Sequence, residues 1–164
     1  MYLTNPSMRA ALFSPLSADG DGFGHLVETA ILSQWLHSHL DVPIYYARWK
    51  RSGKAKSSFG DHAEIDAVHM ARGIRPTRLA EIKRSDSAVN KPEAWHAMRE
   101  FIKLKPSIKS GVFTSRTLTK TKLVEGIKIQ IILSSVYCYV IGRNTVRHRG
   151  KMLVSPLSGE TAVA

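Results

Sequence analysis

Three strand-like segments follow one another in the first half of the chain, and they constrain the fold more than any other feature. They cover residues 42–49, 62–70 and 78–83, and each is rich in β-branched, aromatic or small apolar residues. Polar, glycine-containing links separate them, as expected of turns and hairpin loops. Consecutive strands joined in this way pair antiparallel. We therefore expect a three-stranded antiparallel unit.

Helical patterns lie on both sides of this unit. Residues 24–39 carry apolar side chains at i+4 spacing, which predicts an amphipathic helix. A second helix is predicted between Pro92 and Pro106, because proline suits a first helical turn and stops a helix that reaches it. Further strands are predicted at residues 108–114 and 126–133, and residues 134–141 fit either a strand or a helix.

A helix between two strands permits a crossover to a parallel neighbour. The sequence thus predicts an α/β fold with a central mixed β-sheet flanked by helices. We divide the chain into an entry segment (1–23, with a short helical pattern over 5–13), a single domain (24–142) and a basic, loosely ordered tail (143–164).

Length and composition limit the class of protein. A chain of 164 residues suffices for one domain with a proper core. No apolar run is long enough to span a bilayer, so we expect no membrane association. Cys138 is the only cysteine, which excludes an intrachain disulfide and a cysteine-based zinc cluster and favours the cytoplasm.

The net charge indicates a polyanionic partner. Lysine and arginine number 24 against 13 acidic residues, giving +11 at pH 7, and the basic residues are spread along the chain. Nucleic acid is the natural partner of such a protein. A solvated surface and a basic face for an acidic protein are the alternatives. The residues predicted to contact nucleic acid are Arg48, Lys50, Arg51, Lys54, Arg84 and Lys91.

A pair of charged residues ends the third strand. Side chains alternate along a strand, so Glu81 and Lys83 share one face while Ala80 and Ile82 point into a core. Asp66 lies within the second strand, where strand propensity disfavours it, although an exposed edge strand would also explain it. Glu64 shares the strand face of Asp66 and is the alternative ligand.

These residue types suit a divalent metal and a phosphate. Mg²⁺ takes one or two carboxylates, waters and phosphate oxygens. Asp66 and Glu81 could supply the carboxylates and Ile82 a backbone carbonyl, while Lys83 could orient a water or stabilise the transition state. Glu28, on the first helix, could complete a second site or hold a ligating water, or could simply be a first-turn residue favoured by the helix dipole.

This constellation resembles the PD-(D/E)XK nuclease superfamily through Glu28, Asp66 and the run Glu81-Ile82-Lys83. More narrowly, residues 5–12 and 24–28, together with these motifs, look like the nuclease-like C-terminal domain of a prokaryotic AAA-type ATPase family. The resemblance implies a restriction-endonuclease-like core. Two features depart from it: the chain has no Gly-x-x-x-x-Gly-Lys-[Ser/Thr] phosphate loop, and Ile65 stands where the superfamily's name has proline.

Three hypotheses follow. The leading one is a nuclease domain that uses Mg²⁺ or Mn²⁺ to hydrolyse DNA, with Glu28, Asp66, Glu81 and Lys83 as its catalytic residues. The alternative is a catalytically inactive nucleic-acid-binding or regulatory domain attached to an AAA-type ATPase module, in cis or in trans, since many superfamily members are thought to be inactive. The third is a protein-interaction module. The sequence does not distinguish DNA from RNA as the substrate or cleavage at internal sites from cleavage at ends. It also leaves the oligomeric state open.

Overall fold

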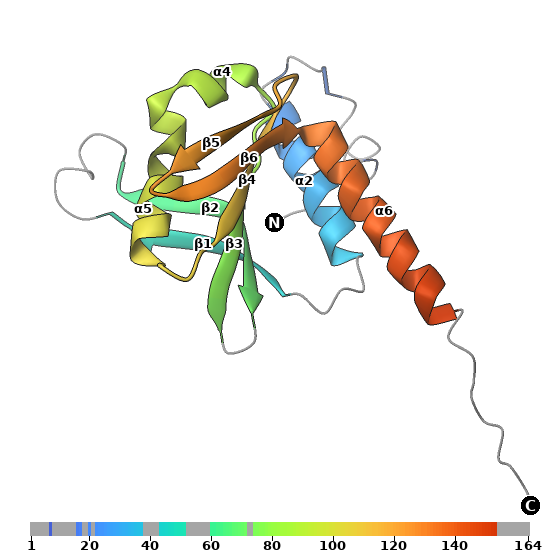
Figure 1. Cartoon of the computed structure of the whole chain (residues 1–164). Coiled ribbons are helices and arrows are strands. Elements are labelled where there is room, and N and C mark those ends of the chain that lie inside the picture. Colours follow the sequence, from blue (N-terminus) through green and yellow to red (C-terminus); the bar gives the residue numbers. More distant parts are fainter. Residues whose placement is uncertain are drawn as a thin grey trace, which may run out of the picture.

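The described residues form one mixed sheet with helices on both of its sides (Figure 1). The computed structural model describes residues 7, 16–17, 20, 22–37, 43–51, 60–71 and 74–153. In chain order the elements are α2 (Phe23–Leu36), β1 (Ile44–Lys50), β2 (His62–Ala71), β3 (Arg75–Glu81), α4 (Asp86–Asn90), η1 (Pro92–Trp95), α5 (His96–Leu104), β4 (Ser110–Ser115), β5 (Lys120–Val124), β6 (Ile127–Leu133) and α6 (Ser134–Leu153).

The strand order across this six-stranded sheet is β1-β2-β3-β4-β6-β5. β1, β2 and β3 pair antiparallel, as the sequence predicts. The chain then crosses over through α4, η1 and α5, so that β4 pairs parallel to β3. β6 also runs parallel to β4, and β5 closes the far edge antiparallel to β6. The prediction of a mixed sheet flanked by helices is confirmed.

One side of the sheet packs against α4, η1 and α5. The indole of Trp95 is fully buried and stacks on Phe113 of β4, with ring centroids 4.2 Å apart. Its Nε1 donates a hydrogen bond of 2.9 Å to the carbonyl of Val89, which ties α4 to η1. This side holds the larger core, because aromatic and long aliphatic side chains from the helices meet Ile65 and Leu79 of the sheet.

The other side packs against α2 and α6, which lie side by side (Figure 1). Small residues of the sheet, Ala67 and Ala80, meet Ile31, Tyr137 and other apolar side chains of the two helices in a second core. α6 approaches α2 closely at Gly142, where a Cβ would lie 2.8 Å from Oε1 of Gln34. Within the described part of the chain, no helix has both the length and the apolar character needed to cross a membrane.

Several elements differ from the sequence prediction. Residues 134–141 are helical, and α6 runs on to Leu153, past the predicted domain boundary at 142, so the tail does not begin at 143. The helix passes that boundary because Gly142 serves close packing and does not end α6. α4 occupies part of a predicted loop, and β5 was not predicted. The predicted segments 5–13, 52–59 and 154–164 lie outside the described residues, apart from position 7.

Candidate functional site

The fold brings three of the predicted site residues into direct contact. The Nζ atom of Lys83 lies 2.7 Å from Oε1 of Glu81 and 3.5 Å from Oδ2 of Asp66. The same Asp66 oxygen accepts a hydrogen bond of 2.6 Å from the backbone N–H of Ile82. An acid from β2, the acid that ends β3 and an amine two residues after that end thus form one cluster, called here the carboxylate–lysine cluster.

Strand pairing explains why Asp66 reaches the end of β3. Ala67 pairs with Ala80, so the next residues along, Asp66 and Glu81, come side by side. β2 is also irregular here: between Tyr45 and Ala47 of β1 the partner residue shifts from Val68 to Ile65, so β2 holds one extra residue. Such bulges redirect side chains and are frequent beside active sites. Ala80 and Ile82 are buried in the core beneath α2 and α6.

Hydroxyl groups from neighbouring elements fix the main chain of Lys83. Its N–H donates to Oγ1 of Thr114 over 2.7 Å, and the same hydroxyl donates to the carbonyl of Lys83 over 2.8 Å. Oγ of Ser134, at the start of α6, lies 3.0 Å from that carbonyl. Thr114 is fully buried, so these hydrogen bonds are shielded from water. Sequence reasoning missed both residues, because a lone Thr or Ser in an apolar segment carries no signal.

Burial and charge set the protonation of the cluster. Burial, followed by the charge of Asp66, raises the pKa of Glu81 to about 8, although Lys83 opposes the shift. Burial also raises the pKa of Asp66, against the charge of Lys83 and the Ile82 N–H. Burial acts to lower the pKa of Lys83, but the charges of Glu81 and Asp66 outweigh it and raise that pKa above its ordinary value. Lys83 is therefore a permanent cation at neutral pH.

Glu28 lies on α2 with a side chain that is largely buried. Its Oε2 is 3.4 Å from Nδ1 of His25, one turn earlier in the same helix. The charge of Glu28 also contributes to the raised pKa of both Asp66 and Lys83. The charge of this fourth predicted residue therefore acts on the carboxylate–lysine cluster from α2. Glu64, the alternative to Asp66, is exposed, and its carboxylate accepts a hydrogen bond from the Tyr46 hydroxyl.

The donor set of the cluster fits a hard divalent cation. Among the described residues, Oε2 of Glu81 is buried without a hydrogen-bond partner. A buried carboxylate oxygen left unpaired is costly, and a metal ion would satisfy it. The described residues contain no group of three or more His, Cys, Asp or Glu arranged to hold a metal. Two carboxylates nevertheless suffice for Mg²⁺ when waters and a substrate phosphate supply the other ligands. The carbonyl of Ile82 as a ligand stays a prediction.

The predicted phosphate-contacting residues have different environments. Arg48, Lys50 and Lys91 are exposed, and Arg84 is half-buried with its guanidinium carbon 5.9 Å from the centre of the Phe23 ring. Arg51 requires a correction. Its side chain is only 7% exposed, and it donates hydrogen bonds to the Glu100 carboxylate and the His62 carbonyl, both over 3.2 Å. Arg51 therefore joins β1 to α5 and is not presented to a ligand. Lys54 lies outside the described residues.

A hollow of about 440 Å³ borders the segment that follows Lys83. Two arginines, three serines and apolar side chains of α2 line it, among them Phe23, Val27, Arg84, Arg116, Ser134 and Ser135. Ser134 and Ser135 are the first residues of α6, a 20-residue helix. Helix N-termini and arginines both favour anions, so this hollow suits a phosphate group.

The sequence matches no protein-family model, and no curated protein matches it significantly.

Proposed function

We propose that this chain is a metal-dependent nuclease domain that hydrolyses DNA, with Asp66 and Glu81 as ligands of Mg²⁺ or Mn²⁺. The observation that carries the proposal is the contact of Lys83 with both carboxylates, at 2.7 Å and 3.5 Å, beside an unpaired buried oxygen of Glu81. The proposal would lack support if the two acids and the lysine were far apart or exposed to solvent. Here they are adjacent and shielded from water.

The proposed roles follow from the chemistry of each group. When bound, the metal would polarise the phosphate and lower the pKa of a bound water. Lys83, a cation held by Thr114 through its backbone, would donate hydrogen bonds to a phosphate oxygen or to the attacking water. Glu28, whose charge acts on the cluster from α2, would hold a further water or a second metal.

The charge distribution supports nucleic acid as the substrate. The protein carries a net charge of +11, and the hollow beside Lys83 contributes Arg84 and Arg116. Contacts from such residues to phosphates position a duplex without reading its sequence. DNA is the proposed substrate, and RNA is the competitor to include in the assay.

Cleavage assays test this proposal directly. Plasmid, linear duplex and RNA substrates are incubated with the protein in Mg²⁺, Mn²⁺ or EDTA. The expected result is metal-dependent cleavage that Asp66→Asn, Glu81→Gln and Lys83→Met each reduce by roughly 100-fold or more. Lys103→Met is the matched control, because that lysine is two-thirds exposed and pairs with Glu125 away from the cluster. Cleavage that is equal in all variants would contradict the proposal.

One observation favours a second candidate, a binding or regulatory domain without turnover. The ammonium of Lys83 balances the charge of one carboxylate, and the pKa of Glu81, raised to about 8, keeps that acid mostly protonated at pH 7, so the cluster carries no net charge without a metal. Such a domain could act beside an AAA-type ATPase module, in cis or in trans. It would bind DNA with the same affinity in EDTA and in Mg²⁺, would cleave nothing, and would keep its DNA affinity in the Glu81→Gln variant.

A further inference from the structure

A cavity of about 830 Å³ lies on the α2–α6 side of the sheet. It lies at the opposite end of the strands from the carboxylate–lysine cluster. Thr77 and Arg78, which precede the last three residues of β3, and Ser110, the first residue of β4, line it. Glu81 and Thr114, by contrast, lie at or near the ends of the same two parallel strands. The cavity is therefore distinct from the site of the proposed nuclease.

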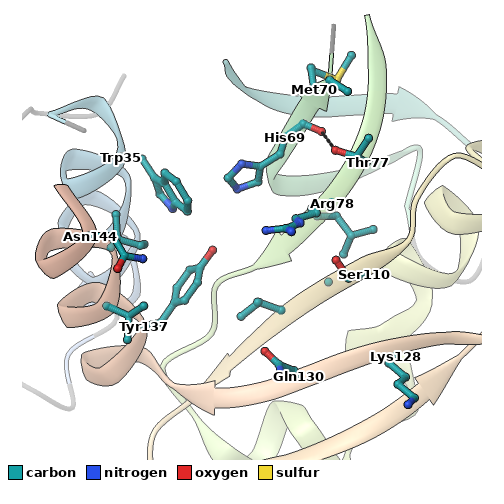
Figure 2. Close-up of a pocket in the computed structure, with 16 residues that line it drawn as sticks. Trp35, His69, Met70, Thr77, Arg78, Ser110, Lys128, Gln130, Tyr137 and Asn144 are labelled. Carbon is teal, nitrogen blue, oxygen red and sulfur yellow. Dashed lines mark hydrogen bonds between the residues drawn. The ribbon is translucent and has the colours of Figure 1, made fainter. Parts of the chain in front are cut away.

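Four side chains from four elements point into this cavity. Figure 2 shows the indole of Trp35, the imidazole of His69, the guanidinium of Arg78 and the hydroxyl of Tyr137 directed toward one common space. The Trp35 and His69 rings meet edge to face, with centroids 4.5 Å apart and planes at 72°. Aromatic rings from α2, β2 and α6 thus form the walls, and a cation from β3 reaches in from the far side.

The electrostatics of the cavity favour an anion. None of the described residues that line it is acidic. Burial and the charge of Arg78 lower the pKa of His69 to about 4, so this imidazole is neutral at pH 7 and can both donate and accept a hydrogen bond. Burial raises the pKa of Tyr137 to about 12, which keeps its hydroxyl protonated. The ammonium of Lys128 lies at the margin and points away from the common space (Figure 2).

We propose that this cavity binds a small anion that carries a planar aromatic ring, of the nucleoside monophosphate class. The guanidinium of Arg78 has the geometry to bind a phosphate through two parallel hydrogen bonds. Trp35, His69 and Tyr137 place aromatic rings around the space that a base would fill, and the amides of Gln130 and Asn144 also line the cavity. The volume falls within the range of pockets that enclose small ligands, roughly 300–1,000 Å³.

Titration calorimetry on the whole chain in EDTA tests the proposal, with AMP, adenosine and inorganic phosphate as the probes. AMP is expected to bind, and adenosine and phosphate each to bind at least tenfold more weakly, because each lacks one half of the ligand. AMP should also change the tryptophan fluorescence, and Trp35→Phe should remove most of that change. No binding of AMP at millimolar concentration, or phosphate binding as tightly as AMP, would overturn the proposal.

Variants locate the binding. Arg78→Met keeps the aliphatic length but removes the charge, and it should weaken AMP at least tenfold. Arg75→Met is the matched control, because Arg75 is also exposed and on β3 but does not line the cavity. Equal losses in the two variants would show non-specific attraction to a basic surface and overturn the proposal. The Asp66→Asn variant should bind AMP as the wild type does. Loss of AMP binding in this variant would place the ligand at the carboxylate–lysine cluster and overturn the proposal.

Discussion

Replacing Lys83 with methionine should destabilise the metal-free protein and leave it rescuable by a divalent cation. Lys83 is the cation that two buried carboxylates share, at 2.7 Å from Glu81 and 3.5 Å from Asp66. Removing it leaves two acids side by side in a site where Asp66 is 7% and Glu81 5% exposed. Loss of the lysine charge also removes a cause that lowers both carboxyl pKa values. The loss of stability of Lys83→Met relative to the wild type should therefore grow as the pH rises from 6 to 8.

The size of the effect follows from burial. Breaking a fully buried ion pair costs about 3–5 kcal/mol. The Lys83 side chain is 32% exposed, so solvent screens part of the interaction and we expect a loss of about 2 kcal/mol. For a chain of this size that loss corresponds to a fall in Tm of about 4–8 °C. A metal at a hundredfold its Kd would restore about 2.7 kcal/mol, enough to reverse it.

Thermal unfolding at pH 8, with and without Mn²⁺, measures both halves of this prediction. Lys103→Met is the control and should shift Tm little, because its pair with Glu125 is on the surface. A metal-free Lys83→Met protein as stable as the wild type would refute the view that Lys83 neutralises the cluster. Failure of Mn²⁺ to raise its Tm would refute Asp66 and Glu81 as metal ligands.

Three further predictions concern pH, packing and salt. The pKa of Glu81 is raised from its ordinary 4.5 to about 8, so the contribution of Glu81 to stability is full below about pH 4.5 and is lost as the pH rises toward 8. Urea denaturation at pH 5 and pH 8 should show this fall in the free energy of unfolding. The Glu81→Gln variant should lack most of the fall. Phe113→Ala removes the ring stacked on Trp95 and should lower the free energy of unfolding by about 3–5 kcal/mol, measured by urea denaturation, whereas a loss below 1 kcal/mol would contradict the packing described. DNA affinity should fall steeply between 50 and 200 mM salt, and Arg84→Ala should reduce the slope of log Kd against log salt. Arg51→Ala should instead lower the stability of the protein, because Arg51 is bonded to Glu100. Equal slopes for Arg84→Ala and wild type would exclude Arg84 from the interface.

The local patterns were enough to predict the antiparallel unit and its crossover. Alternation and turn composition mark β1, β2 and β3, and a helix before the next strand favours a crossover to a parallel neighbour. The same alternation placed Glu81 and Lys83 on one face, and the oddity of an aspartate within a strand singled out Asp66. These are properties of single segments, which a sequence displays directly.

Features that depend on contacts between distant segments were not predictable. β5 has the charged sequence Lys-Thr-Lys at its start and forms a strand only because β6 lies beside it. Thr114 looks like any strand residue until its hydroxyl is seen bonded to Lys83, 31 positions earlier. Arg51 resembles a surface cation, yet Glu100 of α5 draws it into the protein. The cavity around Arg78 likewise exists only once α2 and α6 cover the sheet.

The most direct test of Asp66 and Glu81 as metal ligands is a crystal of the protein soaked in Mn²⁺ and measured for anomalous scattering. Manganese stands in for Mg²⁺ and can be located without ambiguity. We predict one strong peak coordinated by the carboxylates of Asp66 and Glu81, with Lys83 moved off the Glu81 oxygen that it contacts at 2.7 Å. A saturated soak with no peak between these two carboxylates would contradict that prediction.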